Sequence, residues 1–133
     1  MSQANVEIVE RGIDAFNRRD VEALAEVTAL DFEWFPALPG AVEGDGYQGL
    51  QGIETYLGEI LNTWEALQVL ADEYRDLGER VLVLGRFEGR GRGSGVPVDA
   101  PQGIIYDLRG GRISRVRAYL DQDEALRAAG LSE

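Results

Sequence analysis

The sequence predicts one α+β domain in which helices come first and an antiparallel sheet follows. In the first half of the chain, apolar residues recur every three or four positions, as they do on one face of a helix. From about residue 66 onward they alternate with polar residues, as in strands that bury one face. The length of 133 residues is usual for one domain and no internal repeat divides it, so we assign residues 1–133 to a single domain.

Apolar residues at helical spacing predict three amphipathic helices. The sets are Val6, Val9, Ile13 and Phe16, then Val21, Leu24 and Val27, and finally Ile53, Tyr56, Leu57, Ile60, Leu61 and Trp64. Residues 17–20 separate the first two helices, and Asp20 can cap the second because its carboxylate can accept hydrogen bonds from first-turn amides. A short helix over residues 122–129 is expected to end at Gly130, since glycine suits the backbone of a helix C-terminus.

Alternation of apolar and polar residues predicts one short strand before the third helix and four strands after it. The expected ranges are 31–35, 66–76, 80–88, 98–109 and 112–120. Glycines within residues 89–95 and 110–111 supply the turns between the last three strands. Residues 36–52 contain clustered glycine and proline and are predicted to form a loop.

The composition narrows the range of partners. A formal net charge of −11, from 24 carboxylates and 13 basic residues, repels nucleic acid and anionic lipid surfaces, so we expect neither as a partner. No apolar run approaches the roughly 20 residues of a membrane span. The first residues carry neither the basic region nor the apolar stretch of a signal peptide, and we therefore expect a cytoplasmic protein.

The residue types that are missing narrow the chemistry further. The chain has no Cys, no His and no Lys, which excludes thiolate nucleophiles, Ser-His-Asp relays and Schiff-base lysines. A transition-metal site would need several converging carboxylates, and no spacing suggests one, so we expect neither metal nor cofactor. Proton transfer would be left to Asp, Glu, Tyr or a water that they hold.

Three stretches carry a family resemblance: AFNRRD at residues 15–20, YQGLQGI at 47–53 and RGGRISRVRAYLD at 109–121. In this order and spacing they resemble the SnoaL-like branch of the nuclear transport factor 2-like superfamily. The resemblance implies a cone-shaped, curved antiparallel sheet with helices packed on its concave face, also described as a cystatin-like roll. It further implies a pocket between the sheet and the helices, and commonly a homodimer formed through the outer sheet face.

Alternation along each strand then separates inward from outward residues. The residues expected to line an apolar pocket for a small hydrophobic molecule are Trp34, Tyr56, Phe87, Gln102, Ile104, Tyr106, Val116 and Ala118. Leu120 is expected to point the same way. The alternative is that these side chains simply fill a core, because an apolar lining alone does not distinguish the two.

The opposite parity places other residues on the outer face. We expect Arg115, Arg117 and Tyr119 there, together with Leu82 and Leu84, as the contact surface of a homodimer. The glycine- and arginine-rich residues 89–95 superficially resemble a phosphate-binding loop. They lack the Gly-Lys-Ser/Thr ending and join two strands, so a hairpin loop is the better interpretation.

The superfamily includes ketosteroid isomerases, polyketide cyclases, dehydratases, epoxide hydrolases and proteins without catalysis, so membership alone does not define a reaction. Ketosteroid isomerases use a tyrosine, an aspartate base and a protonated aspartate. The positions matching these groups hold Gly12, Phe35 or Pro36, and Ile104, so that catalytic set is absent.

Asp121 matches the acid/base aspartate of the polyketide-cyclase relatives and is the candidate catalytic residue. Its alternative role is to cap the last helix, because Glu124 follows at the capping-box spacing. Two functions therefore stay open, beside a third class, a protein adaptor that works through the sheet face. One is cofactor-free cyclase, isomerase or dehydratase chemistry, with Asp121 as acid/base and Tyr106 or Tyr56 as hydrogen-bond donor. The other is a non-catalytic ligand-binding or dimer-scaffold protein.

Overall fold

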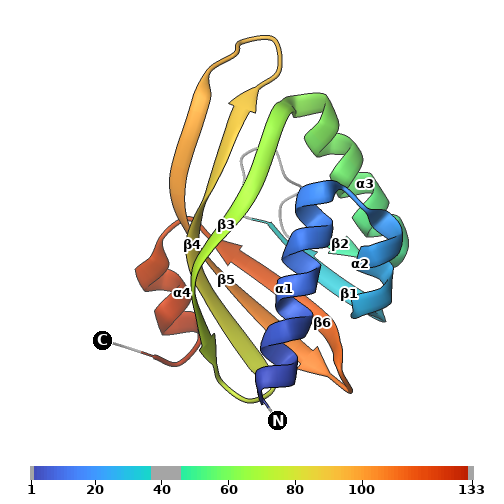
Figure 1. Cartoon of the computed structure of the whole chain (residues 1–133), viewed down its shortest axis with the longest axis vertical. Helices are drawn as coiled ribbons and strands as arrows, with labels where there is room; N and C mark the ends of the chain where they lie inside the picture. Colours follow the sequence, from blue (N-terminus) through green and yellow to red (C-terminus); the bar gives the residue numbers. More distant parts are fainter. Residues whose placement is uncertain (1, 37–45, 132–133) are drawn as a thin grey trace.

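The computed structural model describes residues 2–36 and 46–131 (Figure 1). Its elements are α1 (Ser2–Arg18), α2 (Val21–Val27), β1 (Thr28–Phe35), β2 (Tyr47–Gln48), α3 (Gly49–Thr63), β3 (Trp64–Asp76), β4 (Arg80–Gly91), β5 (Pro97–Arg109), β6 (Arg112–Tyr119) and α4 (Gln122–Ala128). The predicted α+β class is confirmed, and the element boundaries agree within a few residues. The predicted loop over residues 36–52 is wrong at its end, where β2 and the first turn of α3 form; residues 37–45 lie outside the described part.

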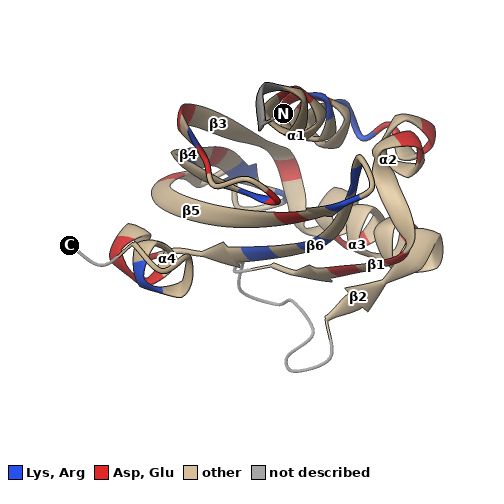
Figure 2. Ribbon diagram, turned by 90° about the horizontal axis from the view of Figure 1, so that it is seen from below, with Lys and Arg blue, Asp and Glu red and all other residues tan. Residues whose placement is uncertain are grey.

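The sheet has six strands in the order β2-β1-β6-β5-β4-β3. Strands β3 to β6 form an antiparallel meander, as alternation predicts. Strand β2 also pairs antiparallel with β1. The exception to the expected antiparallel sheet is β1, which runs parallel to β6. Figure 2 shows how strongly the sheet curls, with α1 on its inner side and α4 outside it.

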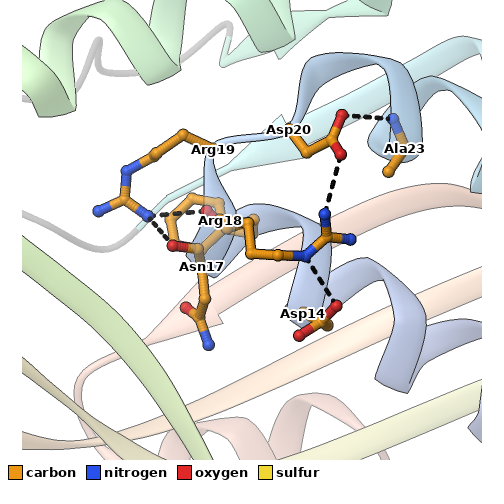
Figure 3. A network of polar contacts seen from close by, with 7 residues as sticks. Asp14, Asn17, Arg18, Arg19, Asp20 and Ala23 are labelled. Carbon is orange, nitrogen blue, oxygen red and sulfur yellow. Dashed lines mark hydrogen bonds and ion pairs between the residues drawn. The ribbon is translucent and has the colours of Figure 1, made fainter.

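The turn between α1 and α2 is held by a local polar network (Figure 3). Asp20 has extended backbone and caps α2, accepting a hydrogen bond from the backbone amide of Ala23 at 3.0 Å, as predicted. This amide, together with the Arg18 guanidinium, holds the pKa of the Asp20 carboxyl below its usual value. Arg18 contacts Asp20 and Asp14, each at 2.9 Å, so one side chain ties the end of α1 to the start of α2.

The same turn fixes α1 against β3. The Asn17 side chain donates to the backbone oxygen of Val69 at 3.0 Å and accepts from the Val69 amide at 2.9 Å. Arg19, whose backbone is left-handed at φ 58°, donates to the backbone oxygen of Leu67 at 2.6 Å. Because β3 is at the end of the strand order, these bonds satisfy backbone groups that have no neighbouring strand.

Apolar residues form two separate cores. The larger one lies between the helices α1 to α3 and the concave face of the sheet. The smaller one lies on the outer face, where α4 covers Leu82, Leu84 and Ile105 with Ala125 and Ala129. The expectation that Leu82 and Leu84 contact a second copy is therefore wrong, because α4 of the same chain buries both of them.

Among the described residues, no helix has both the length and the apolar character needed to cross a membrane.

Candidate functional site

A cavity of about 60 Å³ lies between the concave face of the sheet and the helices. Its lining residues are Gly12, Ile13, Phe16, Leu24, Thr28, Phe32, Trp34, Pro36, Tyr56, Leu67, Val69, Phe87, Gln102, Ile104, Tyr106, Ile113, Val116 and Ala118. All eight residues that the sequence places in the pocket are in this set. Their role in binding a ligand stays a prediction.

Strand pairing explains why the inward residues meet. On β5, Gln102, Ile104 and Tyr106 alternate toward the cavity, and β6 lies beside them in register. Ala118 is opposite Ile104, and Val116 is opposite Tyr106, so the two strands present one continuous surface. Leu120 was expected on this surface and that expectation is wrong. It lies beyond the end of β6 and is 41% exposed.

Aromatic side chains from three elements form one wall of the cavity. Trp34 of β1 packs edge-on against Tyr56 of α3, with ring centroids 4.8 Å apart. Phe16 of α1 packs against the same indole at 5.4 Å, and Phe32 packs against it at 5.9 Å. These edge-to-face contacts favour one arrangement of the rings and give the wall a defined shape.

No charged side chain lines the cavity in the part of the chain that the structure describes. Burial raises the pKa of the Tyr56 and Tyr106 hydroxyls above their usual value, so both stay neutral donors near pH 7. Thr28 is already engaged, because its hydroxyl donates to the backbone oxygen of Leu24 at 2.9 Å. The cavity can therefore offer hydrogen bonds but no charge.

Gln102 is the unusual polar group of the lining. Its side chain is 6% exposed, and its Oε1 atom is buried with no hydrogen-bond partner among the described residues. A buried acceptor without a partner costs roughly 1–3 kcal/mol in a folded protein. The sequence identifies Gln102 as inward-facing by its parity, but it does not reveal this missing partner.

Asp121 lies outside this lining. It is exposed and caps α4, where its Oδ1 atom accepts a hydrogen bond from the Asp123 amide at 2.9 Å. The capping-box spacing points to Glu124 as the partner residue, whereas the bond goes to the residue before it. A catalytic role for Asp121 stays a prediction.

Of the positions that match the ketosteroid isomerase set, Gly12, Pro36 and Ile104 line the cavity, whereas Phe35, the alternative to Pro36, is not among the lining residues. None of them carries an ionisable or hydroxyl group. At Gly12 an added Cβ would lie 3.1 Å from Ile113 Cδ1, so α1 packs closely against β6 at this point. The position that matches the ketosteroid isomerase tyrosine is thus the site of a close helix–sheet contact in this chain.

Helices α1 and α2 and strand β3 contribute lining residues that the sequence pattern does not predict. These include Phe16, Leu24, Leu67 and Val69. For the two helical residues the signal was present, because both lie on apolar helix faces, but helical spacing does not say which end of a face reaches a cavity. The β3 residues border the cavity because the sheet curls, which alternation does not report.

On the outer face, Arg115 and Arg117 have the predicted orientation and each meets a carboxylate. Arg115 contacts Glu33 at 3.1 Å, and Arg117 contacts Asp107 at 3.6 Å.

The described residues contain no group of three or more Asp or Glu placed to hold a metal ion.

Comparisons with known proteins agree with this architecture. An NTF2-like protein of unknown function from Burkholderia pseudomallei superposes with a TM-score of 0.78 at 21% identity, covering 93% of this chain and 95% of that one. TerC, co-crystallised with polyporic acid, gives 0.78 at 22% identity, with 96% and 97% covered. A putative SnoaL-like polyketide cyclase from Jannaschia sp. CCS1 gives 0.77 at 20% identity, with 99% and 94% covered.

At these identities the structural likeness establishes the fold alone. No curated protein matches the chain. The family model described as SnoaL-like domain matches residues 9–116, which is more than half of the sequence. The chain therefore belongs to the SnoaL-like domain family.

Proposed function

We propose that the cavity binds a small, neutral and largely apolar organic molecule. The observation that carries this proposal is that the 18 lining residues, counted in the described part of the chain, bring hydroxyl and amide groups but no charged side chain. An ionised ligand would leave water there without meeting an opposite charge, which is costly in a protein interior. An uncharged molecule exchanges water for apolar contacts and can still form a hydrogen bond.

The size of the cavity limits the ligand. An engineered apolar cavity of about 150 Å³ in another protein admits benzene, whereas this one has about 60 Å³. A molecule of a few heavy atoms fits without rearrangement, and a larger ring system requires lining side chains to move. Four lining residues are only half-buried, namely Trp34, Pro36, Val69 and Ala118.

Binding of a small molecule is common to the catalytic function and to the ligand-binding form of the alternative, whereas a dimer scaffold does not need it. A catalytic step would in addition need a proton acceptor beside the bound molecule. The candidate acid/base, Asp121, is exposed at the start of α4 and does not line the cavity. Cofactor-free cyclase, isomerase or dehydratase chemistry with Asp121 as the acid/base therefore requires a movement that brings this carboxylate to the ligand, and substitutions at Asp121 test it.

Charge discrimination provides the direct test of binding. The chain has two tryptophans, so Trp64→Phe leaves Trp34 as the single indole N–H signal in an NMR spectrum. In this variant we expect isobutyramide to shift that signal saturably, with a dissociation constant on the order of millimolar for so small a molecule. Isobutyrate has the same shape and a negative charge, and we expect it to leave the signal unchanged. Equal shifts with both compounds, or no saturable shift with isobutyramide, would reject the proposal.

We also propose that the outer sheet face pairs two copies of the chain, although Leu82 and Leu84 do not take part. Support comes from Leu30, which is fully exposed on this side of β1, and from the arginine–carboxylate pairs beside it. The surface alternates in charge and so can complement itself. Light scattering should give twice the chain mass of 14.6 kDa at micromolar concentration, and a value of one chain mass would exclude the pair.

A further inference from the structure

The side chain of Gln102 differs from that of Thr28, another polar residue of the cavity lining. The Thr28 hydroxyl has a partner in the Leu24 backbone oxygen, whereas Gln102 Oε1 has none among the described residues. The amide is more than nine-tenths buried, so bulk water does not supply the missing bond. Gln102 pairs with Gly85 of β4, and on its other side it immediately precedes the β5–β6 ladder, which begins at Gly103.

The backbone of Gln102 is anchored from the outer face of the sheet as well. The Gln122 side chain donates to the Gly85 backbone oxygen at 2.9 Å and, more weakly, to that of Gln102 at 3.4 Å. On the inner face, the next inward residue along β5 is Ile104, which brings no polar atom to the amide. The strand is therefore rigidly positioned while the side-chain oxygen stays unpaired, an arrangement that suits a group waiting for a donor from a ligand.

We infer that Gln102 is the specificity-determining residue of the cavity and that it recognises a hydroxyl or N–H group on the bound molecule. The inference rests on the proposed binding of a neutral molecule and narrows its chemistry to alcohols, enols, phenols or amides. A molecule that only accepts hydrogen bonds, such as a ketone or ether, leaves Oε1 without a partner and therefore binds with lower affinity. The tyrosine hydroxyls of Tyr56 and Tyr106 can donate to any ligand that accepts, whereas the unpaired Oε1 of Gln102 favours a ligand that also donates.

Three four-carbon compounds separate the possibilities. 2-Butanol donates and accepts, 2-butanone only accepts, and 2-chlorobutane does neither. Binding of each is followed through the Trp34 indole signal in the Trp64→Phe background, with and without Gln102→Met. The substitution Gln102→Met keeps the length of the side chain. We expect it to lower the affinity for 2-butanol about fivefold and to leave the affinities for the other two compounds within about twofold of the parent values. Ile104→Val is the control. It enlarges the cavity at the same wall and leaves the Gln102 amide intact, so it should change the affinities for all three compounds by the same factor.

A second readout distinguishes recognition from packing. Gln102→Met removes an unpaired buried acceptor, so the ligand-free variant should melt a few degrees higher, about 3 °C, than its parent. A lower melting temperature would show that Gln102 serves the fold and would overturn the inference. So would an unchanged preference for 2-butanol, or an equal loss for 2-butanone, which would mean that the amide donates rather than accepts. If none of the three compounds binds the parent protein, both this inference and the proposed function fail.

Discussion

The side-chain amide of Gln122 donates a hydrogen bond to the backbone oxygen of Gly85 at 2.9 Å. Gly85 is opposite Gln102 in the β4–β5 register, so the first residue of α4 is tied to the strands directly behind the cavity. Nearby, an added Cβ at Gly103 would lie 2.4 Å from Ala125 Cβ, which shows how closely the helix approaches. Helix α4 thus supports the sheet at the position of Gln102, the polar residue of β5 that lines the cavity.

The close approach of α4 predicts a large effect for one added methyl group. Gly103→Ala should lower the free energy of unfolding by about 1–3 kcal/mol, because the new methyl overlaps Ala125 and the helix must move. Gly58→Ala is the matched control, since nothing lies within 4 Å of its added Cβ. This change in the middle of α3 should be neutral or stabilise by up to about 1 kcal/mol. Urea denaturation measures both, and equal effects would mean that α4 does not pack on Gly103 in solution.

A second expectation concerns the free space in the cone. Ala118→Leu should occupy the cavity and abolish the isobutyramide-induced shift of Trp34, with a change in unfolding free energy below about 1 kcal/mol. If the space is not present in solution, the larger side chain overpacks a filled core and should cost about 1–3 kcal/mol. Thermal melts and the binding titration together decide, and a stable variant that still binds isobutyramide would place the ligand elsewhere.

The two roles of Asp121 give opposite results for one pair of substitutions. Asn caps a helix about as well as Asp, so Asp121→Asn should leave the stability almost unchanged, whereas Asp121→Ala should cost about 0.5–2 kcal/mol. The lost contact is the bond from the Asp123 amide. If Asp121 is an acid/base, both variants should also lose activity by about a hundredfold or more. We expect the cap alone, and a stable but inactive Asp121→Asn protein would refute this.

The buried tyrosines predict a loss of stability in alkali. Burial raises the pKa of Tyr56 and Tyr106 above the ordinary value of 10.0, so the folded protein retains their protons where the unfolded chain releases them. Unfolding free energy should therefore be independent of these groups below about pH 9 and should fall as the pH rises above about 10. Tyr106→Phe should make the fall less steep. Denaturation between pH 8 and pH 11 tests this, and identical slopes for both proteins would contradict it.

Much of the fold follows from local patterns in the sequence. Helical spacing locates α1 and α3, Asp20 marks the start of α2, and alternation gives the four long strands with their inward residues. All eight predicted pocket residues line one cavity. For those on β4, β5 and β6 the reason is that the parity of a strand survives folding where its ladder is regular, and Tyr56 comes from the apolar face of α3.

The sequence-based predictions fail where contacts between segments that are distant in sequence determine the structure. The register between β1 and β6 shifts between Thr28 and Glu33, and within this irregular stretch Leu30 points fully to solvent, which no local pattern predicts. The position of α4 on the outer face depends on Gly103 and Ala125, which are 22 residues apart in sequence and meet only in the folded chain. The unpaired state of Gln102 likewise depends on every side chain around it.

The bonds of Asn17 and Arg19 to β3 have a consequence for the protein at high concentration. An uncovered edge strand invites the edge of another copy to pair with it, and this is a common start of aggregation. Here the amide and carbonyl of Val69 and the carbonyl of Leu67 are already occupied by side chains from α1, while the strand at the opposite edge, β2, is only two residues long. These side chains oppose edge-to-edge pairing at Leu67 and Val69, and the shortness of β2 leaves little strand to pair at the opposite edge.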